Sequence, residues 1–254
     1  MIKFFRRIRQ RLLSENKISK YLLYAIGEIV LVVIGILIAL AINNSNQRRV
    51  IEEKEQVYLK GLKEEFETSK AKLTVLTDIN RKNLREAKKL IGYASDNNKI
   101  PDEEMFSEIL FNTFSPDISF NPNNSLLDEI INSGSLKDIS NTRLRVRLTN
   151  WISTIEDVSK QEQELAIQRE KVLDIFRRNE NSLRTILDLT GVNEDLGIDK
   201  LEQPESNLKL LDSREFENNI LMFILTSKGT EEAHYLPLMD ELNTILDLIE
   251  KEIQ

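Results

Sequence analysis

The chain has 254 residues and a formal net charge of −7, with one His, no Cys, 8 Gly and 5 Pro. The lack of cysteine excludes disulfides and thiolate metal sites, and a single His excludes a site built from several histidines of one chain. A low Gly and Pro content with 30% charged residues favours long helices over a turn-rich β protein, so we expect an all-α fold.

Residues 21–42 form the most apolar stretch, YLLYAIGEIVLVVIGILIALAI, in which Glu28 is the one acidic or basic side chain. About 22 helical residues cross a hydrocarbon core about 30 Å thick, so we predict a single transmembrane helix. A cleavable signal peptide ending near Ala39-Leu40-Ala41 is the alternative. It fits less well, because the basic segment and the apolar run are both longer than in typical signal peptides.

The segment before this span, residues 1–20, is strongly basic. It carries seven Lys or Arg and one Glu, so the remaining 234 residues carry 28 basic and 41 acidic side chains. The positive-inside rule predicts a cytoplasmic N-terminus and export of everything after Ile42. Four apolar residues between Phe4 and Leu12 share one helical face, so we expect an amphipathic helix on anionic membrane lipid. We favour the interpretation of the basic run as an orientation signal alone over specific lipid or partner binding, for which the candidate lipid-contacting residues are Lys3, Arg6, Arg7, Arg9 and Arg11.

Glu28 is the costly residue of the span, because a carboxylate in hydrocarbon must be neutralised, paired or near the interface. It is a candidate for a proton or ion path or for docking another membrane protein. The alternative is a protonated or interface-reaching side chain, and its position does not separate the two readings. Gly35 and Ala39, with Gly27 two turns earlier, are candidates for close helix packing.

The opening sequence MIKFFRRIRQRLLSENKISKYLLYAIGEIVLVVIGILIALAINN resembles a family of Gram-negative bacteria called domain of unknown function "six-zero-nine-zero". Its members share the basic stretch, the pattern KYLxYAIGEIxLVVxGILIALxINN and a helical exported region. The segment from Ser125 to Trp151 is similar more loosely, and Ser45 stands where members often have an aromatic residue. The resemblance implies a single-pass inner-membrane protein with a periplasmic C-terminal domain, and it implies no activity.

The exported part begins with a helical pattern that lasts to about Ser95, where loop residues and Pro101 end it. Shorter helices are predicted from Asp102 to Phe114 and from Ser125 to Ser133, with Pro116 and Pro122 breaking the chain between them.

The strongest periodicity runs from Leu144 to Ile186 in steps of three and four, nearly six heptads, with Trp151 expected in the core. Polar residues interrupt this seam at Glu162, Arg169 and Asn179. Such a seam requires a partner helix. We favour an antiparallel pair with residues 46–95 of the same chain over pairing with another protomer.

The C-terminal part reads as a loop over residues 191–204 and two helices, Ser213–Thr226 and Thr230–Ile253, on either side of Gly229. Glu231-x-x-His234 has the spacing of half a di-iron site, but no second His exists, so we expect a structural or surface role. No phosphate-binding glycine loop, nucleophile elbow or zinc-binding His pair is present. We expect a protein that is not an enzyme and binds no cofactor.

These observations predict three segments: a cytoplasmic basic segment (1–20), a transmembrane helix (21–42) and an elongated periplasmic helical bundle with coiled-coil-like helices (43–254).

The predicted function is that of a membrane-anchored scaffold or interaction protein. The expected partners are membrane lipid and either another protein or a second copy. Nucleic acid is not expected, because the exported part is acidic. The alternatives are an accessory subunit of an inner-membrane complex that uses Glu28, and a ligand-sensing bundle.

Overall fold

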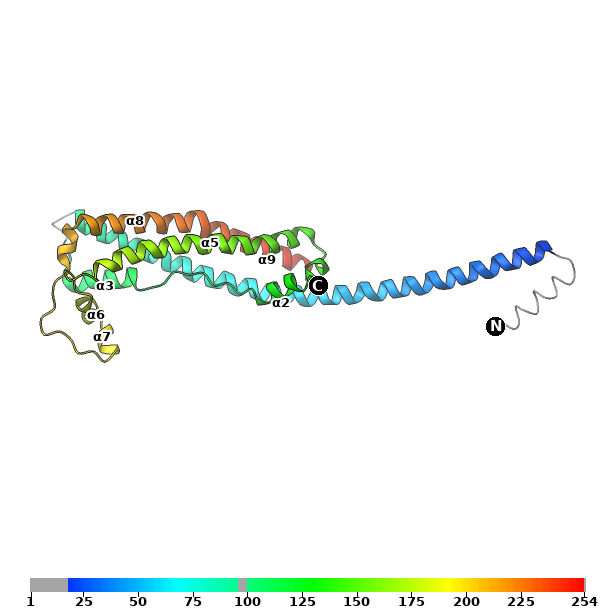
Figure 1. Ribbon diagram of the computed structural model, residues 1–254, viewed down its shortest axis with the longest axis horizontal. Helices are drawn as coiled ribbons and strands as arrows, with labels where there is room; N and C mark the ends of the chain where they lie inside the picture. Colours follow the sequence, from blue (N-terminus) through cyan, green and yellow to red (C-terminus); the bar gives the residue numbers. More distant parts are fainter. Residues whose placement is uncertain (1–17, 96–99, 254) are drawn as a thin grey trace. The chain divides into compact units, whose positions relative to one another are not determined.

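The computed structural model describes residues 18–95 and 100–253, and it contains helices and no β-strand over these residues (Figure 1). The all-α prediction is therefore confirmed. The elements are α2 (Ile18–Ser95), α3 (Glu103–Phe114), α4 (Ser125–Asn132), the 3-10 helix η2 (Ser135–Asp138), α5 (Thr142–Ile175), α6 (Leu183–Leu189), α7 (Val192–Asp195), the 3-10 helix η3 (Leu208–Asp212), α8 (Arg214–Thr230), the π-helix η4 (Glu231–Tyr235) and α9 (Leu236–Glu252).

The chain divides into two units, residues 1–55 and 56–254. In the first, the large apolar side chains of α2 from Leu22 to Ile42 are between 47% and 78% exposed. Among the described residues, α2 is the one helix long and apolar enough to cross a membrane, which is compatible with a single-pass membrane protein. The predicted amphipathic segment, with its lipid-contacting Lys and Arg residues, falls within residues 1–17, outside the described part of the chain.

The second unit, residues 56–254, is called the helical unit below. Four stretches of chain pack along it in alternating directions: α2 from Gln56 onward, the segment from α3 to α4, then α5, and finally α8 with η4 and α9 (Figure 1). The contacts that set these directions are Ser69 with Asn123, Phe66 with Trp151, Asn80 with Ser227, Lys63 with Glu250, and Gln161 with Thr230. The arrangement is an up-down-up-down bundle.

This topology corrects the predicted pairing of the two long helices. Phe66 of α2 lies against Trp151 of α5 with ring centroids 5.1 Å apart, and farther along, Asn83 and Leu165 line one cavity. Contacts therefore advance in the same direction on both helices, so α2 and α5 are parallel and not antiparallel. The reason is that the segment from α3 to α4 returns along the bundle between them.

The helical unit buries a heptad face of α2 in steps of three and four. Its buried positions are Leu59, Leu62, Phe66, Ser69, Leu73, Leu76, Thr77, Asn80, Asn83, Ala87 and Leu90. Four of the eleven are polar, which is why apolar residues alone do not reveal the register. Val57, which continues the apolar pattern of the sequence, is 69% exposed.

The seam predicted from Leu144 to Ile186 is broken in the structure. It is buried along α5 as far as Ile175, but turns follow and a new helix, α6, begins at Leu183. Five of the six residues from Arg177 to Ser182 are charged or amide residues, and the Ser182 side chain accepts a hydrogen bond from the amide of Thr185. This N-cap starts a separate helix, so Asn179 does not belong to the seam.

The break predicted at Gly229 is also absent, because α8 continues through it to Thr230. The irregularity lies one turn later, in η4, where the amide of Leu236 donates to the carbonyl of Glu231. Pro237 follows within the first turn of α9 and has no amide to donate to the preceding turn. The chain therefore stays helical from α8 to α9, with the wider turn of the π-helix η4 between them.

Candidate functional site

The most unusual feature of the helical unit is an extended segment, residues 115–124, which separates α3 from α4 in the middle of a helical bundle. Pro116 and Pro122 prevent this segment from continuing either helix. Apart from the Ser115 amide and the Asn124 carbonyl at its two ends, the segment lies outside the helical hydrogen-bond pattern, and buried backbone groups need hydrogen bonds from elsewhere. Side chains of α2 and α5 supply such bonds, and Tyr235 of η4 binds one of these side chains, Glu162.

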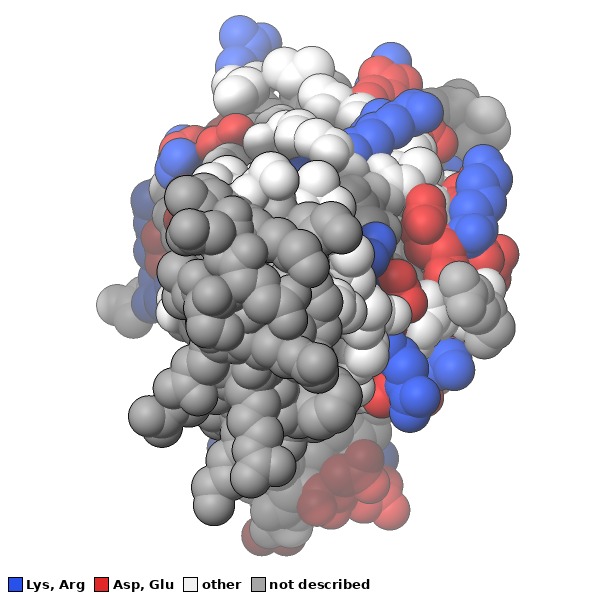
Figure 2. All heavy atoms as spheres, turned by 90° about the vertical axis from the view of Figure 1, so that its right-hand side faces the viewer, with Lys and Arg blue, Asp and Glu red and all other residues white. Residues whose placement is uncertain are grey.

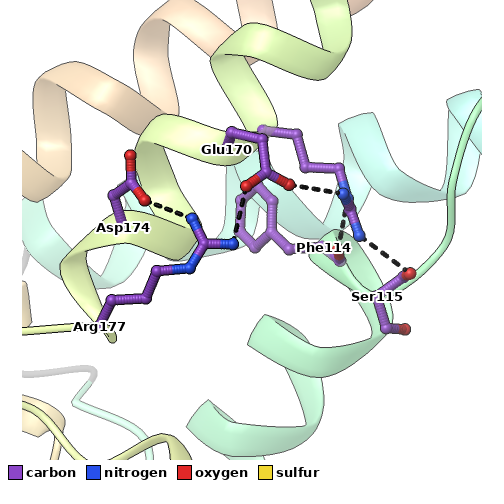
Figure 3. Close-up of polar contacts among 6 residues, drawn as sticks. Phe114, Ser115, Glu170, Asp174 and Arg177 are labelled. Atoms are coloured by element: carbon purple, nitrogen blue, oxygen red, sulfur yellow. Dashed lines mark hydrogen bonds and ion pairs between the residues drawn. The ribbon is translucent and has the colours of Figure 1, made fainter.

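Arg169 of α5 satisfies the end of α3. Its guanidinium donates to the carbonyl of Phe114 at 2.6 Å and to that of Ser115 at 3.2 Å. Glu170 pairs with both Arg169 and Arg177, and Figure 3 shows Glu170 between Arg177 on one side and Phe114 and Ser115 on the other. A cation at a helix C-terminus also interacts favourably with the helix dipole, so Arg169 fixes where α3 stops.

Glu162 of α5 holds the centre of the segment. The amide of Phe120 donates to both carboxylate oxygens, at 2.9 and 3.1 Å, and the hydroxyl of Tyr235 donates to Oε1 at 2.7 Å. Glu162 is 6% exposed and Tyr235 1%. The carboxylate is thus buried with two donors from different stretches of the bundle.

Residues of α2 and α5 satisfy the start of α4. The Glu65 carboxylate accepts hydrogen bonds from the amides of Leu126 and Leu127, at 2.7 and 3.2 Å. Ser69 accepts from the amide of Asn123, and Trp151 donates through Nε1 to Asn124 at 3.0 Å. Together with Glu162 and Arg169, these side chains hold an irregular backbone inside a regular bundle.

The electrostatics of Glu162 follow from its burial. Desolvation raises the pKa of the carboxyl group, and nearby Asp117 acts in the same direction, whereas the hydrogen bonds from Tyr235 and Phe120 oppose the shift. Burial and the contact with Glu162 raise the pKa of Tyr235 strongly, so its hydroxyl remains a donor.

The π-helix η4 connects this buried pair to a surface groove. Tyr235 points into the core toward Glu162, while Ala233 and His234 line the groove on the outside. Turns of π-helix are rare and occur frequently at functional sites. Glu231, the first residue of η4, pairs with Arg81 of α2 at 2.6 Å, so the turn is anchored to the bundle.

The groove lies between α5 on one side and η4 with α9 on the other, and its volume is about 920 Å³. Arg147 of α5 pairs across it with Glu241 of α9. Its lining consists of Thr142, Arg143, Val146, Arg147, Asn150, Thr154, Asp157, Val158, Ala233, His234, Pro237, Leu238 and Glu241. In the end-on view of Figure 2, acidic and basic side chains are interspersed along the right-hand side, and a group of acidic side chains lies at the bottom.

The chain matches the family described as "Family of unknown function (DUF6090)" over residues 28–158, just over half of its length. The chain belongs to this family. No curated protein and no solved structure matches it. The matched range contains the extended segment and the α5 wall of the groove, whereas Glu162, Tyr235 and η4 follow it. The resemblance seen in the sequence is thus confirmed, while its density over the first 44 residues remains a prediction.

In this DUF6090 protein, the predicted intramembrane residues lie in the first unit, on α2. Glu28 is partly exposed, and Gly27, Gly35 and Ala39 are exposed. A Cβ atom built on Gly27 or Gly35 meets no atom within 4 Å, so no described residue packs closely on either glycine. Their roles in packing and docking stay predictions.

The Glu231-x-x-His234 pair is not part of a metal cluster among the described residues, since Glu231 binds Arg81 and His234 faces the groove. Sequence reasoning missed Tyr235 and Asn83 as parts of the core site. The sequence feature that indicated a buried polar site was the presence of Glu162 and Arg169, whose polar side chains interrupt an otherwise apolar seam.

Asn83 provides a test of this polar core. It is 1% exposed, and neither atom of its amide has a hydrogen-bond partner within the described protein. We expect Asn83→Leu to raise the free energy of unfolding by about 1 kcal/mol, because an unsatisfied buried amide is removed. The measurement is denaturant unfolding of the full chain in detergent, followed by the fluorescence of Trp151, the single Trp.

The matched control is Asn80→Leu, one turn away on the same buried face. Asn80 exchanges two hydrogen bonds with Ser227, at 2.8 and 3.1 Å, so this variant should lose about 1–3 kcal/mol. If Asn83→Leu destabilises as much as Asn80→Leu, Asn83 binds a polar group in the core and the prediction is wrong.

Proposed function

We propose that this DUF6090 protein is a single-pass protein of the bacterial inner membrane whose helical unit works in the periplasm as an interaction module and not as a catalyst. The observation that carries the proposal is that no part of the apolar run of α2 is buried against other described residues. Such a surface is stable when lipid covers it. The basic segment before it supports a cytoplasmic N-terminus.

The interaction role is supported by the groove of the helical unit. Binding surfaces between helices combine apolar contact with a few placed polar groups, and this groove has both, in Val146 and Pro237 and in Arg143 and Asn150. A scaffold or adaptor that presents such a surface to a protein partner needs no reactive group.

The topology is tested with single cysteines, which the chain accepts cleanly because it has none of its own. Ser153→Cys is on an exposed position of α5, and Ser14→Cys is in the basic segment. With a membrane-impermeant maleimide and a permeabilised outer membrane, Ser153→Cys should react in intact cells and Ser14→Cys after lysis. The reverse pattern contradicts the proposal, and loss of residue 14 from the mature protein identifies a cleaved signal peptide.

An accessory-subunit role, in which Glu28 docks another membrane protein, is favoured by one observation. Glu28, Gly35 and Ala39 follow at seven and four residues and so share one face of α2. We expect Glu28→Leu to reduce copurification of a membrane partner and Glu28→Gln to retain it. Equal copurification with both variants would exclude this role.

A further inference from the structure

The outer surface of α8 carries a strip of exposed apolar side chains. Leu221, Met222 and Leu225 are 43%, 46% and 65% exposed, and they lie within about one turn of helix. The opposite side of α8 is buried in the bundle through Phe216, Ile220 and Phe223. A helix that is apolar on all sides is normally covered on all sides, so this apolar strip favours a contact surface.

A row of cations on α2 borders the apolar strip. Arg81 pairs with Glu231 of η4 at 2.6 Å, so this side of α2 lies beside the stretch formed by α8 and η4. Arg85 and Lys88 follow at four and seven residues and share the side of Arg81. Since α2 and α8 run in opposite directions, both cations lie level with the apolar strip. Both are exposed and form no ion pair with the described residues. The apolar strip with Arg85 and Lys88 is called the α8 face below.

The segment that begins at the end of α7, residues 194–205, has the opposite charge and also exposes apolar side chains. It contains five acidic residues and one basic residue, and it is called the acidic lobe below. Leu196, Ile198 and Leu201 in this lobe are 64%, 42% and 36% exposed. The amide of Leu201 donates to the buried Asp188 carboxylate at 3.1 Å, so the lobe is tied to α6 and presents these side chains in a fixed arrangement.

The acidic lobe and the α8 face lie at the same end of the helical unit but on different sides of it. The lobe is followed by η3, which leads into α8 at Arg214, and Leu221 is seven residues, about 10 Å, farther along α8. The α6 helix packs against α3, and Figure 1 shows α6 and α7 on the side of the unit away from α8. The lobe of a chain therefore leaves the α8 face of the same chain exposed.

We propose that the acidic lobe of one copy binds the α8 face of a neighbouring copy. Leu196, Ile198 and Leu201 pack on the apolar strip, and carboxylates of the lobe lie near Arg85 and Lys88. The second copy is selected because its lobe complements the α8 face both in charge and in apolar surface. This inference rests on the proposed membrane anchoring and names the partner of the interaction module.

The membrane anchor favours this contact. Copies inserted in one membrane share one orientation, so the lobe of one copy stands at the level of the α8 face of the next, and confinement to the membrane raises their effective concentration. Because the lobe and the α8 face are different surfaces, the contact is heterologous and joins copies into a row or a ring.

The test is disulfide crosslinking between two differently tagged versions of the full-length chain in isolated membranes. The chain has no Cys, so one version carries Ile198→Cys and the other Met222→Cys. An added oxidant makes the reaction independent of the side of the membrane on which the helical unit lies. The matched control replaces Met222→Cys by Val75→Cys, at a position of α2 that is 60% exposed outside the α8 face. We expect about tenfold more linked dimer with Met222→Cys, because the contact raises the effective concentration of the two thiols.

Charge reversal tests the complementarity. Arg85→Glu combined with Lys88→Glu, placed in the Met222→Cys version, should reduce the dimer yield about tenfold, because attraction becomes repulsion. Lys60→Glu combined with Lys251→Glu makes the same change in net charge at exposed positions outside the α8 face and should leave the yield unchanged.

Reversal of the lobe should then restore the contact. Asp199→Lys combined with Glu202→Lys, placed in the Ile198→Cys version, changes two exposed carboxylates of the lobe into cations. With the reversed α8 face, this version should return the dimer yield to about its original level, because the charges are again opposite. Such a restoration identifies the lobe of a second copy as the occupant of the α8 face.

Three results would overturn the proposal: equal yields with Met222→Cys and Val75→Cys, equal effects of the two charge reversals on α2 and its control, or no restoration by the reversed lobe. A disulfide from the lobe to a different protein as the main product would also overturn it. An inverted topology in the labelling of Ser153→Cys and Ser14→Cys would refute the proposed function, while the dimer yields would still decide whether copies meet through these surfaces.

Discussion

Replacing Glu162 with leucine is expected to lower the free energy of unfolding of the helical unit by roughly 3 kcal/mol. The substitution keeps a side chain of similar size in the core but removes the acceptor of the Phe120 amide and of the Tyr235 hydroxyl. Both donors are buried, and each unsatisfied donor costs about 1–3 kcal/mol. Because Phe120 lies in the extended segment, we also expect that segment to lose its attachment to α5.

The conservative variants separate hydrogen bonding from charge. Glu162→Gln keeps an acceptor oxygen for both donors and should cost less than about 1 kcal/mol, and Tyr235→Phe removes one hydrogen bond and should cost about 1 kcal/mol. Denaturant unfolding in detergent, followed through Trp151, gives all three values. Equal stability of the leucine and glutamine variants would show that the carboxylate does not hold the extended segment.

The same residue predicts a pH dependence of stability. Burial raises the pKa of folded Glu162 above its ordinary value of 4.5, so the folded protein keeps this proton to higher pH than the unfolded chain. The part of Glu162's contribution to stability that is linked to proton binding is therefore fully present below about pH 4.5 and is lost as the pH rises through the raised pKa. The difference in unfolding free energy between wild type and Glu162→Gln should change in this window. A difference that is constant with pH would contradict the raised pKa.

Replacing Trp151 with alanine should have the largest effect of any single core substitution considered, a loss of about 3–5 kcal/mol. Trp151 is fully buried and packs against Phe66 of the parallel helix, with ring centroids 5.1 Å apart. Its indole also donates to Asn124 at the start of α4. The substitution removes the largest buried side chain at a point where three of the four stretches meet.

Trp151→Phe is the control, because it keeps an aromatic ring against Phe66 and loses the hydrogen bond to Asn124. We expect it to lose about 1–2 kcal/mol. Since both variants remove the fluorescent reporter, unfolding is followed by far-UV circular dichroism in detergent. A loss of under 1 kcal/mol for Trp151→Ala would mean that Trp151 does not join α2 and α5 in the folded unit.

The candidate site was partly visible in the sequence. Glu162 and Arg169 interrupt an otherwise apolar seam, and a charged residue at a buried position needs a partner. The partners themselves were not predictable: the donors to Glu162 are a hydroxyl 73 residues away and an amide 42 residues away. Asn83 and Ser69 were missed because polar residues on a helix are expected to face solvent.

The sequence alone determined the properties that depend on neighbouring residues. The apolar run of α2, the helix from Glu103 to Phe114 with its Asp102 cap, and the all-helical composition follow from local periodicity and capping. Tertiary structure decided the direction of the long helices, the end of the seam at Ile175 and the π-turn before Pro237. These features depend on which distant side chains satisfy buried backbone groups, and a heptad pattern shows where a helix face is buried without showing what covers it.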